Sequence, residues 1–213
     1  RGIWALVIHF ADRKSWAAGA ILVAVALGLG AFVLSTRLQI GDLDPGAPEL
    51  RPFSRYNQDN AFVTKNFSLS SDVYAVIVKT PKEGCLKYAT LMQADRLAWQ
   101  LQQLPEVQTT VSLTNVVRLT TAGSFEGSPK WLTLSRNQDV LNYGAQQATV
   151  NNPELFNVEC SVMPVIAYLR DHKAATLDRV SGTVERFIAD NPVADVELLP
   201  AAGSAGIEAA VNQ

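Results

Sequence analysis

The feature that most constrains this chain is a stretch without any charge, from Trp16 to Leu34. At a rise of 1.5 Å per residue, a helix of this length is about as long as the hydrocarbon core of a bilayer is thick, roughly 30 Å. We therefore predict a transmembrane helix. A cleaved signal peptide is the alternative, but its apolar region is usually shorter and ends in small residues, and Val33, Leu34 and Arg37 offer no good cleavage site.

The charges on either side predict how this helix is oriented. Arg13 and Lys14 precede the apolar stretch, whereas Asp42, Asp44 and Glu49 follow it. Because positively charged flanks stay in the cytoplasm, we expect a cytoplasmic N-terminus. Everything after about residue 38 should then be extracytoplasmic.

One face of the predicted helix carries small residues, at Ala20, Ala24 and Gly28 and again at Ala31 and Ser35. Residues four apart share a helix face, and small side chains let helices in lipid approach each other closely. The row predicts a neighbouring transmembrane helix. The alternative is that alanine and glycine are simply common in such segments.

The hydrophobic pattern after this helix alternates between helical and strand periods. Pro45, Pro48 and Pro52 make residues 41–54 an extended connector, and Ser54 is a typical N-cap. The pattern then predicts, in order, a helix over 55–67, a strand over 73–78, a helix over 86–104, a strand over 107–113, a strand over 162–169, a helix over 177–188 and a strand over 194–198.

This order of elements is that of the ferredoxin-like (split βαβ) fold. It is an α+β arrangement in which two helices cover one face of an antiparallel sheet with the strand order four, one, three, two. Pro164 cannot donate a ladder hydrogen bond, so the third strand should begin after it or bulge there. We divide the chain into a cytoplasmic-side and transmembrane part over 1–38, a connector with a short helix over 39–72, the domain over 73–200 with an insertion over 114–159, and an approach to a second transmembrane helix over 201–213.

The two cysteines occupy related places in this topology. Cys85 follows the first strand and Cys160 precedes the third, so both fall at the same end of neighbouring antiparallel strands. We predict a disulfide between them, which suits the oxidising compartment that the helix orientation predicts. Two buried free thiols are the alternative.

The insertion contains a predicted helix from about 137 to 148 and two aromatic residues, Phe125 and Trp131. Long insertions usually have a function. These side chains could contact a hydrophobic substrate or a partner, or they could form a small core of their own.

Composition argues against several classes of function. With a net charge of -2, the chain has no basic surface suited to nucleic acid. His9 and His172 are the only histidines, so no set of zinc ligands remains once the cysteines are paired. We expect no metal, no cofactor and no enzymatic activity, and we interpret His172 as a surface residue at the start of a helix.

Three segments resemble a known family. They are Ile40-Gly-Asp-Leu-Asp-Pro-Gly-Ala-Pro-Glu-Leu-Arg-Pro after the apolar helix, Ser71-Asp-Val-Tyr-Ala-Val-Ile-Val at the first strand and Ala202-Gly-Ser-Ala-Gly-Ile near the end. Together they resemble the first part of a bacterial RND-superfamily exporter of the MMPL-like type. The matching part is the N-terminal transmembrane helix and the first periplasmic porter subdomain.

The resemblance implies a proton-driven pump of the bacterial inner membrane that passes hydrophobic or lipid-like molecules outward. It implies as partners the bilayer, further transmembrane helices, a second porter half of the same protein and a hydrophobic or lipid substrate, with a homo-oligomer left open. The proton-carrying acids of that family lie on later helices, and none lies between Trp16 and Leu34. The alternative is a single-pass membrane protein that presents a periplasmic ferredoxin-like interaction or sensor module. The two differ in whether an apolar segment of about 20 residues follows Gln213.

Overall fold

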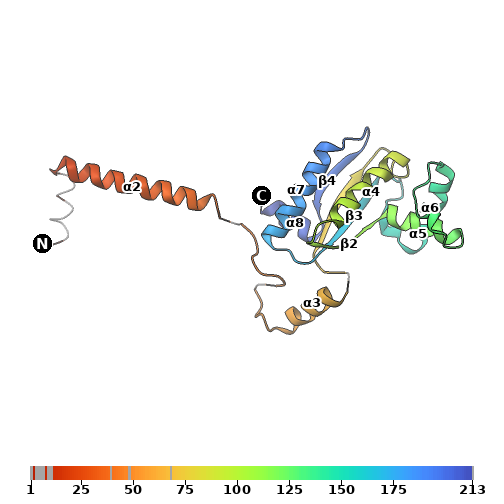
Figure 1. Ribbon diagram of the computed structural model, residues 1–213, viewed down its shortest axis with the longest axis horizontal. Coiled ribbons are helices and arrows are strands. Elements are labelled where there is room, and N and C mark those ends of the chain that lie inside the picture. The colour runs from red at the N-terminus through yellow and green to blue at the C-terminus, as the bar shows by residue number, and fades with distance from the viewer. Residues whose placement is uncertain are drawn as a thin grey trace. The chain divides into compact units, whose positions relative to one another are not determined.

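The structure is a computed structural model that describes residues 2, 8, 12–38, 40–47, 49–67 and 69–212. The chain divides into two compact units, Arg1–Gln39 and Ile40–Gln213. The described residues form seven α-helices and one four-stranded antiparallel sheet (Figure 1). The fold class is therefore α+β, as predicted.

The first unit contains helix α2, Lys14–Ser35. None of its 22 residues is buried, and the helix is long and apolar enough to cross a membrane. This agrees with the prediction of an apolar N-terminal helix. A helix that exposes apolar residues on all sides requires lipid or a partner to cover them.

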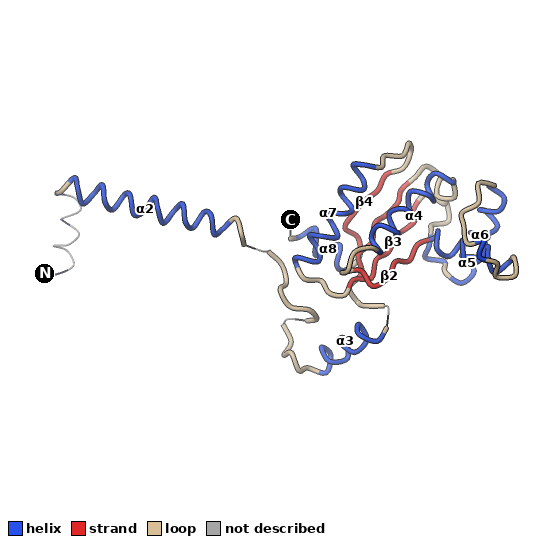
Figure 2. The backbone as a smooth tube through the Cα atoms, viewed as in Figure 1, coloured by secondary structure: helices blue, strands red, loops and turns tan. Residues whose placement is uncertain are grey.

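The second unit is built on a sheet with the strand order β2-β3-β1-β4; Figure 2 draws its strands in red. All neighbouring strands are antiparallel. The strands predicted over 73–78 and 162–169 are central and those predicted over 107–113 and 194–198 lie at the edges, which is the predicted order four, one, three, two. The strands are β1 (Val73–Lys79), β2 (Val107–Ser112), β3 (Val162–Leu169) and β4 (Glu197–Ala202).

Helices α4 (Tyr88–Gln102) and α7 (Ala174–Asp190) pack on one face of the sheet (Figure 1). Apolar residues recur at three- and four-residue spacing on both helices, which gives each one a stripe that faces the strands. The α7 helix ends at Asn191, and Pro192 prevents its continuation. The buried side chains at this interface include Tyr74, Val76, Val78, Leu91, Leu97, Leu101, Val165, Val180 and Val184.

Simple alternation over residues 107–113 predicts one face with Val107, Thr109, Val111 and Leu113 and an opposite face with Gln108, Thr110 and Ser112. The edge strand β2 differs from this pattern. A bulge between Val107 and Thr109 shifts its register against β3. As a result Thr110 and Ser112, which were expected to face away, lie buried on the helix side, whereas Val111 is only half-buried. One extra residue in a strand moves every later side chain to the other face.

Pro164 also differs from expectation, because it lies inside β3 opposite Ile77 without a break in the register. The β2 strand pairs with β3 only from Val165 onward, so no neighbour on that side needs an N–H at position 164. The last strand begins at Glu197 rather than at 194. The residues before it form a turn in which Asp195 has a φ of 61°.

The insertion starts directly after β2 with a helix that the sequence pattern did not predict. Helices α5 (Leu113–Ser124) and α6 (Gln138–Asn151) pack against each other, with short 3₁₀ turns at Pro129–Trp131 and Pro153–Leu155. The α6 helix matches the predicted one. Buried residues from Leu113 onward join the same hydrophobic core as α4, namely Leu113, Val117, Leu134, Leu141, Ala145 and Leu155.

The described chain ends in helix α8 (Ser204–Val211), which folds back onto β1, β4 and α7. Two glycines permit this close approach. Gly203 has a φ of 82°, and a Cβ atom at Gly206 would lie 2.7 Å from the carbonyl carbon of Ala201. The expectation that this segment leads to a second transmembrane helix stays a prediction.

Candidate functional site

The connector joins the domain at one end of the sheet, where β1 starts and β3 ends. We call this the connector end. The backbone N–H of Ala174, the first residue of α7, donates to the carbonyl oxygen of Asp42 at 2.8 Å. Helix α3 (Arg55–Asn66) is held at the same end, because the Gln108 side chain donates to the Thr64 carbonyl oxygen at 2.7 Å. Ser54 caps this helix as predicted, and its hydroxyl accepts from the backbone N–H of Asn57.

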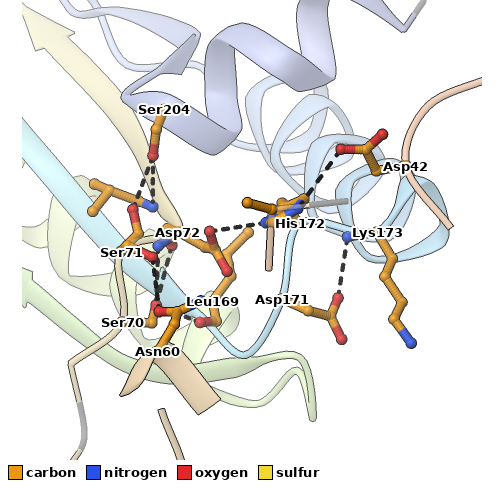
Figure 3. Close-up of polar contacts among 12 residues, drawn as sticks. Asp42, Asn60, Ser70, Ser71, Asp72, Leu169, Asp171, His172, Lys173 and Ser204 are labelled. Atoms are coloured by element: carbon orange, nitrogen blue, oxygen red, sulfur yellow. Dashed lines mark hydrogen bonds and ion pairs between the residues drawn. The ribbon is translucent and has the colours of Figure 1, made fainter. Parts of the chain in front are cut away.

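His172 lies at the centre of the connector end (Figure 3). Its Nδ1 atom is 3.0 Å from a carboxylate oxygen of Asp72, the residue before β1. Its Nε2 atom is 3.7 Å from a carboxylate oxygen of Asp42 in the connector. The side chain is only 12% exposed, so our interpretation of His172 as a surface residue is wrong. One imidazole thus joins the connector to the start of a central strand.

The surrounding charges favour the protonated form of this imidazole. The hydrogen bond to Asp72 is the main cause that raises the pKa of His172 from 6.5 to about 9. Burial opposes this rise, and the negative charges of Asp72, Glu208 and Asp42 add to it. Burial also raises the pKa of the Glu208 carboxyl, whereas the charge of His172 lowers it. At neutral pH the junction is therefore an imidazolium among carboxylates.

Serine hydroxyls hold the neighbouring strand ends but do not form a catalytic pair with His172. Ser204 accepts from the backbone N–H of Val73 at 3.2 Å and donates to the carbonyl oxygen of Ser71 at 3.0 Å (Figure 3). Both ring nitrogens of His172 face carboxylates. Nδ1 is hydrogen-bonded to Asp72, whereas Nε2 is within ion-pair distance of Asp42 but beyond hydrogen-bond distance; this arrangement is suited to holding segments together.

The second notable feature is the sheet face opposite α4 and α7, which we call the open face. Its central pairs are Ile77 with Pro164, Ile77 with Leu199 and Val111 with Ile166. These side chains are half-buried or, for Leu199, 39% exposed. An antiparallel sheet with one solvated face usually alternates apolar and polar residues. Here the centre of the open face is also apolar, with the ion pair of Lys79 and Glu197 at one end of it, and helices α4 and α7 both lie on the other face (Figure 1).

At the end of the sheet opposite the connector end, Cys85 and Cys160 form the predicted disulfide, with Cα atoms 5.2 Å apart. The backbone N–H of Cys85 also donates to the carbonyl oxygen of Cys160 at 3.0 Å. The covalent bond thus continues the pairing of the two strands past the end of β1 and before the start of β3. It closes a loop that contains α4, β2 and the whole insertion.

The other predicted site residues lie in the insertion and along α2. Phe125 and Trp131 stack on each other with ring centroids 4.1 Å apart, which favours a local cluster within the insertion. Their contact with a substrate or partner stays a prediction. Ala20, Ala24 and Gly28 are exposed along α2, and the neighbouring helix that they predict likewise stays a prediction.

Within the part of the chain that the structure describes, no three His, Cys, Asp or Glu side chains are grouped so that they could hold a metal ion. His9 lies outside the described residues. Comparison with models of known protein families found no matching family, and comparison with curated proteins found no match either. The connector end and the open face are therefore interpreted from their own geometry.

Proposed function

We propose that this chain is the N-terminal part of a proton-driven RND-type exporter of the bacterial inner membrane, which moves hydrophobic or lipid-like molecules. In this proposal α2 spans the membrane with its N-terminus in the cytoplasm, and residues 73–200 form a periplasmic ferredoxin-like porter subdomain. The family resemblance of the sequence motivates the proposal. The structural observation that carries it is the apolar open face.

An apolar sheet face favours assembly with another layer of protein. Burial of apolar area is worth about 25 cal/mol per Å², so covering a whole sheet face is strongly favourable. In an exporter with two porter halves, the second half of the same polypeptide would cover the open face. The covalent link would make this packing intramolecular, and hence far more favourable than an encounter between separate proteins.

The open face also supports a second candidate, a single-pass membrane protein that presents an interaction module. In that case a separate protein would cover the face. The two candidates predict different partners for Ile166, which lies on the central strand β3 and faces outward from the helix layer.

A photo-crosslinking experiment separates them. Benzoylphenylalanine is placed at Ile166 of the parent protein in its native membrane, and irradiated samples are compared by intact mass and, after protease digestion, by the masses of crosslinked peptides, which reveal an adduct within one polypeptide. The exporter predicts an adduct without a gain in mass, because both ends belong to one polypeptide. The interaction module predicts a gain equal to one other protein.

The matched control places the same probe at Trp99, which is 66% exposed on the outer side of α4. It should give little adduct in either case. If Ile166 crosslinks no more than Trp99 does, the open face has no protein partner and the proposal loses its support. The cheapest independent check is whether the reading frame after Gln213 encodes an apolar segment and, later, intramembrane acids.

A further inference from the structure

Residues 40–69, which contain the connector and α3, expose many large apolar side chains. Nine such residues are exposed within these 30 positions, whereas only ten are exposed in the 143 positions from Ser70 to Asn212. The exposed group includes Phe53, Tyr56, Phe62, Phe67 and Leu69. We call residues 40–69 the apolar segment. A concentration of this kind on a soluble surface usually marks a contact site.

Helix α3 contacts the rest of the chain through polar side chains and exposes its apolar ones, which is the opposite of the usual arrangement. No residue of α3 is buried. Its contacts with the rest of the chain are polar: the Asn57 amide bonds to both backbone groups of Ala47, and Asn60 accepts from the hydroxyl of Ser71. Surface helices of soluble domains normally direct apolar residues inward. Here polar residues face the domain, and Phe62 is left 62% exposed.

Covalent geometry limits how far the apolar segment can be from the end of α2. Asp42 is fixed to the domain by Ala174 and His172. It follows Ser35, the last residue of α2, by only seven positions. Seven residues span at most about 25 Å in any conformation. If α2 crosses a bilayer, the connector end of the domain is within this distance of the point where the chain leaves the helix.

We propose that the apolar segment lies on the lipid surface of the membrane that α2 enters, with its phenylalanine and tyrosine side chains in the headgroup region. The inference rests on the proposed membrane insertion of α2. Aromatic side chains favour this region because their rings are apolar and can nevertheless lie at the hydrated interface between headgroups and acyl chains. Charge contributes little to this contact, since residues 40–69 carry three basic and four acidic side chains; the contact is expected to depend on the apolar side chains.

Lipid contact can be measured by spin-label accessibility in the full chain. Both cysteines of the chain are in the disulfide, so one added cysteine gives a single labelling position. The variants are Phe62→Cys in α3, Val25→Cys in α2 and Leu119→Cys in α5. Leu119 is the matched control, because it is 65% exposed but lies in the insertion, away from the connector end. Each labelled chain is placed in vesicles of phosphatidylethanolamine and phosphatidylglycerol, and collision rates with oxygen and with a water-soluble nickel chelate are measured.

The expected oxygen-to-nickel ratio is highest at position 25, intermediate at 62 and lowest at 119, with a severalfold difference between 62 and 119. A ratio at 62 equal to that at 119 would overturn the surface proposal while leaving the anchor intact. A label at 62 that neither reagent reaches would also overturn it, because it would indicate contact with protein. An aqueous ratio at 25 would refute membrane insertion of α2 and both proposals with it.

Discussion

The bridge formed by His172 makes a specific prediction about how the stability of the domain depends on pH. The folded domain raises the pKa of this imidazole to about 9, whereas the unfolded chain should leave it near 6.5. A group with a raised pKa binds its proton more tightly in the folded state. Its contribution is therefore fully present below pH 6.5 and is lost as pH rises from 6.5 through about 9.

The magnitude follows from the size of the shift. Each pKa unit corresponds to about 1.4 kcal/mol, so the difference between 6.5 and about 9 corresponds to about 3 kcal/mol. This is a large part of the stability of a typical domain, which is about 5–15 kcal/mol. Because the side chain is only 12% exposed, solvent should screen the bridge less than it screens a surface ion pair.

The assay is urea unfolding of the full chain in detergent micelles between pH 6 and pH 9.5, followed by tryptophan fluorescence. The wild-type chain and His172→Gln are compared, because the contributions of all other groups are common to both chains and cancel in the difference. The free energy of unfolding of the wild-type chain should exceed that of His172→Gln by about 3 kcal/mol at pH 6, and this difference should approach zero towards pH 9.5. Asp72→Asn should reduce the pH dependence more than Asp42→Asn does, since the hydrogen bond to Asp72 is the main cause of the raised pKa. A difference that stays constant over this range would refute the reasoning.

Two further predictions concern the disulfide and the glycines of the last helix. Replacing Cys85 and Cys160 together by serine should lower the free energy of unfolding by about 4 kcal/mol in the chain-entropy account of a loop with a separation of 75. Wild-type chain that unfolds at the same urea concentration with and without reductant would contradict this. Gly206→Ala should destabilise by about 1–3 kcal/mol, because the new Cβ meets the backbone of Ala201. The matched change is Gly182→Ala in α7, where no other side chain or neighbouring element lies within 4 Å of the new Cβ. It should be neutral or stabilise by up to about 1 kcal/mol. Equal shifts in the melting temperature of the two variants would contradict the packing argument.

The sequence predicts those parts of the fold that depend on local periodicity. The segments that begin at Val73 and Val162 are almost continuously apolar, which is typical of central strands. In α4 and α7 the apolar residues recur at three- and four-residue spacing. The type and order of these elements were therefore predictable. Helix α5 was missed because valine and threonine dominate its first half and favour strands. The four-residue spacing of Leu113, Val117 and Thr121, all three of which are buried, is the signal that could have identified it.

The connector end could not be predicted from the sequence. His172 is separated from Asp72 by 100 positions and from Asp42 by 130, and neither pairing leaves a local pattern. The cysteines are 75 positions apart, yet their pairing was predictable because each one directly adjoins a central strand. The pairing of His172 with Asp42 differs from that of the cysteines because Asp42 lies in a connector without regular structure. Its position follows from tertiary contacts alone.

Both central strands carry apolar residues on both of their faces, which favours a second layer of protein over the open face. In β1, Val76 lies under the helices and Ile77 lies on the open face. Threonine at position 77 would satisfy strand propensity and would hydrate well, so propensity alone does not require isoleucine there. The same reasoning holds for Ile166 on β3. An apolar residue on both faces of a central strand reduces solubility unless a second layer buries it. In the proposed exporter, as in the alternative interaction module, a second layer of protein would bury these residues, and their burial would stabilise that assembly.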